Sequence, residues 1–115
     1  MIEKQDNMDV ETRLSGGAIV ITPLVNEITH NNNRGFLNAV KDSLIDHSGD
    51  AVIDMSNIQI IDSVSLGSLV AALKYVRSRG GEMFIAGAAP AILQLFDMLN
   101  FRSIFKIYDN VENIP

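Results

Sequence analysis

The chain has 115 residues, of which 47% are hydrophobic and 20% are charged, and this balance predicts one globular domain over residues 1–115 with a core at about 8–111. It contains no cysteine, which excludes disulfides, thiolate metal sites and thiol nucleophiles. The net charge of -5, with nine basic residues scattered among fourteen acidic ones, argues against a nucleic-acid partner.

The N-terminal segment, residues 1–9, is polar and acidic. It lacks the charged start and apolar run of a signal sequence, and no apolar stretch in the chain is long enough to span a bilayer. We therefore expect no direct membrane insertion and predict a cytoplasmic protein.

Two strands are predicted to open the fold. Apolar residues alternate with polar ones over residues 8–14, which predicts a half-buried strand. Ser15, Gly16 and Gly17 then form a turn, and the β-branched run 18–24 predicts a second strand. The two strands are expected to pair as an antiparallel hairpin.

Helices and strands alternate after the hairpin. Apolar residues at helical spacing predict helices that begin after the polar residues 29–33, near Ser63 and at Pro90. A buried strand is predicted at 51–55, and further strands are predicted at 82–86 and 104–108. The resulting order is ββαβαβαβ. This order predicts an α/β fold with a mixed, mostly parallel sheet and helices packed on it.

Ser63 is the first candidate functional residue, because it lies where a loop ends and a helix begins. A serine at this position commonly acts as the N-cap. A phosphoryl group there would also be stabilised by the free amides and the positive end of the helix dipole, so the modified chain should stay folded. Phosphorylation would add about 1.5 to 2 negative charges beside Asp62 and repel an acidic or apolar partner. Ser63 is thus predicted to control binding.

Three ordered motifs resemble the STAS domain of bacterial anti-sigma factor antagonists, also called anti-anti-sigma factors. They are Asp54-Met55-Ser56, Ile61-Asp62-Ser63 and Leu66-Gly67. The family pattern is D-x-S, then I-D-S-S-G-x-G at the start of a helix, and Ser63 falls on the serine that the family's partner kinase phosphorylates. The resemblance covers roughly residues 14–111 and implies a single STAS-like domain.

The chain departs from the family pattern at three positions. Val64 stands where a second serine is usual, Ser65 where glycine is usual, and Thr29 where the first loop carries aspartate. Ser65 is therefore a second possible phosphoacceptor. Gly67 keeps the family's glycine, and because glycine in a helix costs about 1 kcal/mol relative to alanine, we expect close packing to require it there.

The resemblance implies a partner switch rather than an enzyme. The unphosphorylated chain would bind a serine kinase that doubles as an anti-sigma factor, phosphorylation of Ser63 would release the kinase, and a serine phosphatase would reset the switch. ATP and metal belong to the kinase, so no cofactor, metal or catalytic residue is expected in this chain. The implied partner-binding residues are a docking corner (Asp62, Val64, Ser65, Leu66 and Ser68) and a neighbouring loop (Asn26, Glu27 and Thr29).

Two alternatives remain at this point. The chain could be a STAS scaffold or a regulatory subunit associated with a transporter, as the altered Val64 and Ser65 positions would allow. It could also be a small hydrolase that uses Ser63, with His30 or His47 as the base, which only geometry could establish. The sequence does not identify the kinase, the sigma factor, the pathway or the oligomeric state.

Overall fold

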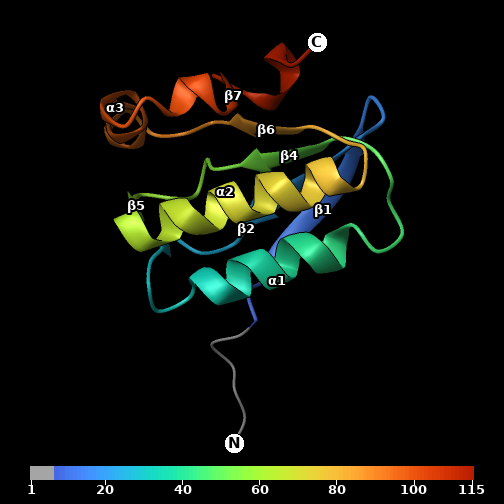
Figure 1. Cartoon of the computed structure of the whole chain (residues 1–115), viewed down its shortest axis with the longest axis horizontal. Helices are drawn as coiled ribbons and strands as arrows, with labels where there is room; N and C mark the ends of the chain where they lie inside the picture. Colours follow the sequence, from blue (N-terminus) through green and yellow to red (C-terminus); the bar gives the residue numbers. More distant parts are fainter. Residues whose placement is uncertain (1–6) are drawn as a thin grey trace, which may run out of the picture.

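The computed structural model describes residues 7–115, a five-stranded sheet with three helices (Figure 1). The strands are β1 (Val10–Ser15), β2 (Ala18–Pro23), β3 (Glu27–Ile28), β4 (Ala51–Asp54), β5 (Ile60–Ile61), β6 (Met83–Ala86) and β7 (Lys106–Tyr108). The helices are α1 (Asn33–Ser43), α2 (Ser63–Ser78) and α3 (Pro90–Met98), with short 3-10 turns η2 (Phe101–Ser103) and η3 (Val111–Asn113). Most of the N-terminal segment predicted to lack a signal sequence, residues 1–6, lies outside the described residues.

The main sheet has the order β1-β2-β4-β6-β7. β1 and β2 are antiparallel, whereas β2, β4, β6 and β7 pair in parallel. This confirms the predicted mixed, mostly parallel sheet opened by a hairpin. No helix in the described part of the chain is long and apolar enough to cross a membrane.

One face of the sheet carries the main core. Ile21, Ile53 and Ile85 of the three central strands are fully buried there. Their helix partners in the same core include Phe36 of α1, Leu69 of α2 and Phe96 of α3. α1 and α2 therefore lie side by side over one face of the sheet, as Figure 1 shows.

The opposite face of the sheet carries a smaller hydrophobic cluster. Val20, Val52 and Ala86 are buried on this face, and Val111 and Ile114 from the C-terminal segment pack against them. Strand residues thus alternate between a thick core under three helices and a thin one under η3.

The first strand differs from its prediction. β1 was expected to be half-buried, but it lies at the edge of the sheet and all of its residues after Val10 are exposed. Leu14 is 72% exposed. The alternation of apolar residues correctly indicates a strand, but it does not report whether a helix covers that part of the sheet.

Two short strands and the two 3-10 turns were not predicted. β3 and β5 have two residues each and pair with one another in parallel, which forms a second small sheet. Near the C-terminus the predicted strand 104–108 is shorter, because Phe101 begins η2 and pairing with β6 starts only at Lys106. Elements this short leave no periodic pattern in the sequence.

Candidate functional site

The small sheet β3–β5 brings two predicted contact segments together. Glu27 pairs with Ile60 and Ile28 pairs with Ile61, and the amide of Asp62 donates to the Ile28 carbonyl at 3.3 Å. The segment that begins at Asn26 therefore runs beside the residues that lead into α2. This pairing places the predicted loop next to the docking corner.

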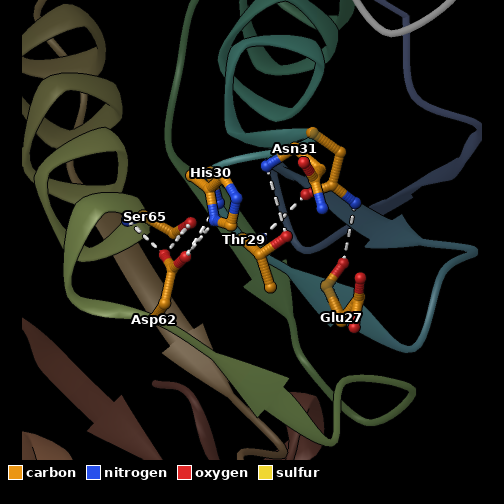
Figure 2. Close-up of polar contacts among 7 residues, drawn as sticks. Glu27, Thr29, His30, Asn31, Asp62 and Ser65 are labelled. Carbon is orange, nitrogen blue, oxygen red and sulfur yellow. Dashed lines mark hydrogen bonds and ion pairs between the residues drawn. The ribbon is translucent and has the colours of Figure 1, made fainter.

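Asp62 is the N-cap of α2. Its backbone is extended, and its Oδ1 accepts hydrogen bonds from the Ser65 amide at 2.9 Å and the Ser65 hydroxyl at 2.7 Å (Figure 2). The interpretation of Ser63 as the N-cap is thus wrong by one residue. Ser63 is the first residue of the helix, and Asp62 takes the capping role because a carboxylate there accepts from the residue three positions on.

The second oxygen of Asp62 joins the helix start to the β3–α1 loop. Oδ2 accepts from the His30 amide at 2.8 Å and lies 3.2 Å from His30 Nδ1 (Figure 2). The Ser65 hydroxyl, followed by the His30 and Ser65 amides, holds the pKa of the Asp62 carboxyl well below its ordinary value, while burial opposes this shift. Asp62 therefore stays ionised and links the two segments.

The β3–α1 loop is also held internally. The Thr29 amide donates to Asn32 Oδ1 at 2.8 Å, and Asn32 Nδ2 donates to the Glu27 carbonyl at 2.9 Å. Thr29 Oγ1 accepts from the Asn31 amide at 3.3 Å. These contacts give the loop a defined shape before any partner arrives.

Ser63 and Val64 form the exposed start of α2. Ser63 is exposed, and its hydroxyl forms no hydrogen bond with any of residues 7–115. Val64 is 57% exposed. A hydroxyl in this position is accessible to another protein, and an apolar side chain stands beside it.

Gly67 does not have the close contact that was expected. It lies on the exposed side of α2, and a Cβ added there would meet nothing within 4 Å. Packing within this chain therefore does not require glycine at this position. The open surface one turn after Ser63 leaves room for the backbone of another molecule to approach.

The sequence profile of the STAS domain matches residues 9–114, almost all of the described chain. The chain belongs to the STAS domain family. Among named relatives, the anti-sigma F factor antagonist of Paenibacillus polymyxa is 36% identical over 62 residues. That match spans 54% of this chain and 53% of the relative, so it covers about half the length of each protein.

Solved structures show the same fold. An anti-sigma factor antagonist from Mycobacterium paratuberculosis superposes with a TM-score of 0.77 at 18% identity, over 97% of this STAS domain and 94% of that chain. The murine anion transporter Solute Carrier 26 family member A9 gives a TM-score of 0.75 at 11% identity, over 87% of this domain and 17% of the transporter. At these identities the likeness shows the fold alone.

The STAS domain places its predicted contact residues at different depths. Asn26, Ser63 and Val64 are exposed, while Asp62, Glu27 and Ser68 are half-buried. Ser65, Leu66 and Thr29 are buried. The predicted contact residues therefore divide into an inner group that shapes this surface and an outer group that a partner could touch.

His30 and Asn32 were missed as members of the site. His30 is bound to Asp62 although 32 positions separate them, and only the pairing of β3 with β5 brings them together. Its position directly after Thr29, in the loop already proposed as a contact, was the one available signal. Asn32 gave a signal only as one of the polar residues 29–33 that precede the first helix.

The geometry does not match a nucleophilic triad. In a triad the histidine lies between the serine and the carboxylate. Here Asp62 lies between Ser65 and His30, so the serine hydroxyl donates directly to the carboxylate. Among residues 7–115, no group of His, Asp and Glu side chains is arranged to hold a metal ion.

Replacing Asp62 by alanine is expected to lower the Tm by about 5 °C at pH 7, because α2 loses its N-cap. In the folded chain the pKa of the Asp62 carboxyl lies below the ordinary 3.8, so the unfolded chain binds the proton first as the pH falls. The stabilisation is complete well above pH 3.8 and decreases below it. Thermal melts should therefore show a smaller Tm difference between wild type and Asp62→Ala at pH 3 than at pH 7. An equal Tm difference at the two pH values would rule out the ionised cap. At pH 7 the Tm of Asp62→Asn, which keeps a capping oxygen, should lie between the Tm values of wild type and Asp62→Ala.

Proposed function

We propose that this STAS domain is an anti-sigma factor antagonist that works as a phosphorylation-controlled switch. The unphosphorylated protein binds a serine kinase that also acts as an anti-sigma factor, and phosphorylation of Ser63 releases it. The observation that carries the proposal is the exposed Ser63 hydroxyl at the first position of α2, which has no hydrogen-bond partner among residues 7–115. The similarity to the Paenibacillus polymyxa antagonist supports it.

The start of α2 suits a phosphoryl group. The amides of Ser63 and Val64 open the helix and so have no acceptor within it. They and the helix dipole favour an anion at this position. The anion would nevertheless stand beside the ionised Asp62, so the surface becomes strongly negative while the fold is kept. The switch therefore acts on partner affinity.

Ser63 is a better acceptor than Ser65. Ser65 is 0% exposed, and its hydroxyl is already donated to Asp62. A kinase would have to break the cap of α2 to reach it. Ser63 needs no such rearrangement.

The exposed residues around Ser63 are proposed as the partner contact. Val64 supplies an apolar side chain, and Asn26 offers a polar one from the neighbouring loop. Asp62, Ser65, Leu66, Ser68, Glu27 and Thr29 contribute by shaping this surface or by contact at its margin. The protein acts by binding, without turnover, and a serine phosphatase restores the unmodified form. This role places it in the cytoplasm, with the kinase and the sigma factor.

The first test is phosphorylation by a soluble extract of the host cell supplied with ATP, followed by intact mass measurement and site mapping. We expect one added phosphoryl group on Ser63 in the wild type and in Ser68→Ala, the matched control, and none in Ser63→Ala. Modification of Ser65, or no modification, would contradict the antagonist function and favour a scaffold or a transporter-associated STAS domain.

A further inference from the structure

Within the part of the chain that the structure describes, the outer edge of β1 pairs with no other strand. β1 is the first strand of the sheet order and pairs only with β2 within residues 7–115. Five of its six residues are exposed, among them Leu14. Edge strands of this length commonly carry lysine, proline or a bulge that prevents pairing with another chain. β1 has no lysine, proline or bulge and pairs with β2 over its whole length, and its two charged residues, Glu11 and Arg13, have opposite signs.

The hairpin register identifies which backbone groups face outward. The Leu24 amide donates to the Asp9 carbonyl at 2.9 Å, so odd-numbered residues of this strand exchange hydrogen bonds with β2. In an antiparallel ladder the intervening residues point the other way. The amides and carbonyls of Val10, Thr12 and Leu14 are therefore directed to the free edge.

The sequence of this edge is complementary to itself. We propose that a second copy of the chain pairs antiparallel along β1, with Thr12 opposite the partner's Thr12 on a two-fold axis. Val10 then lies opposite the partner's Leu14, and Glu11 opposite the partner's Arg13. The outward backbone groups of Val10, Thr12 and Leu14 meet their counterparts and form about six hydrogen bonds. The product is a continuous sheet across two protomers.

The side chains fit this register on both faces. Val10 and Leu14 share the helix-side face with Ile19 and Ile21, so the pairing covers the exposed Leu14. Glu11 and Arg13 lie on the opposite face. Neither has an ion-pair partner among residues 7–115, and each gains one of opposite charge.

Charge also selects this register over its neighbours. A shift by one residue would set outward backbone groups against groups already bonded to β2. A shift by two would place Glu11 opposite the partner's Glu11, or Arg13 opposite the partner's Arg13. Like charges directly opposite one another destabilise a strand pair. The two-fold axis at Thr12 is the one arrangement in which both charges are matched.

Sedimentation of the full, unmodified chain over a concentration series tests the pairing without any kinase. We expect a reversible dimer that weakens with added salt. Glu11→Arg and Arg13→Glu should each weaken self-association by about tenfold, because two like-charge pairs replace two opposite ones. The double variant Glu11→Arg with Arg13→Glu should restore it. An equimolar mixture of the two single variants should form a heterodimer.

A backbone variant tests the same edge independently of charge. Thr12→Pro removes an amide that points away from β2, so the fold should be retained while the dimer is lost. Circular dichroism melts check that each variant is folded. A monomer at all concentrations would overturn the proposal, as would a dimer that the charge exchange leaves unchanged. Neither result bears on Ser63, which lies outside β1.

Discussion

Ser63→Asp is expected to bind the partner kinase about tenfold more weakly than the wild type, with a Tm within about 2 °C of it. Affinity falls because the carboxylate introduced by Ser63→Asp adds a permanent charge beside Asp62 on the surface that the kinase would contact. The Asp62 side chain is itself 30% exposed there. The Tm is kept because a carboxylate in the first turn of α2 is favoured by the helix dipole. Titration calorimetry with the kinase recovered in the phosphorylation experiment measures the affinity.

Two controls separate charge from shape at this position. Ser63→Ala removes the hydroxyl without adding charge, so it should bind as tightly as the wild type and resist release by ATP. Ser78→Asp places the same charge at the other end of α2, on an exposed position, and should leave affinity unchanged. Equal affinity of Ser63→Asp and wild type would remove the basis for a switch at the start of α2.

Gly81→Ala is expected to destabilise the fold by about 3 kcal/mol. A Cβ at residue 81 would lie 2.2 Å from the Gly49 carbonyl oxygen, which is backbone and cannot rotate away. The same contact region is tied by the Glu82 amide to Asp50 Oδ1 at 2.9 Å and by the Ala51 amide to the Glu82 carbonyl at 2.9 Å. The segment that leads into β4 and the segment that leads into β6 can therefore separate only by losing these hydrogen bonds. Urea unfolding measures the change.

Gly67→Ala is the matched comparison for this variant. Its Cβ would meet nothing, and alanine is favoured over glycine in a helix by about 1 kcal/mol, so the free protein should become more stable. Stabilisation by Gly81→Ala, or destabilisation by Gly67→Ala, would show that the packing around α2 differs from the one described. If Gly67→Ala also binds the kinase less well, the glycine serves the complex rather than the fold.

The sheet was predictable because its strands and helices carry strong local patterns. The alternating residues 8–14, followed by Gly16 and Gly17, indicate a hairpin, and both glycines adopt positive φ in the turn. The apolar spacing of Leu66, Leu69 and Leu73 marks α2, and all three side chains are buried. The element order that follows from these patterns is the one observed in the main sheet.

The exposure of β1 and the true cap of α2 could not be predicted in the same way. Alternation shows a strand but not its place in the sheet, so the 72% exposure of Leu14 depends on which elements pack nearby. Asp62 and Ser63 are both good capping residues, and local sequence does not say at which of them the backbone leaves the extended conformation. The choice depends on the pairing of β5 with β3.

The sequence by itself determined the order of the elements, the hairpin, the buried faces of the helices and the serine at the start of α2, because each depends on neighbouring residues. Tertiary structure alone decided that His30 binds Asp62, that Ser65 is buried while Ser63 is exposed, and that Gly67 faces open space. Each of these features depends on how segments far apart in the chain pack together, and packing, rather than local propensity, selects it.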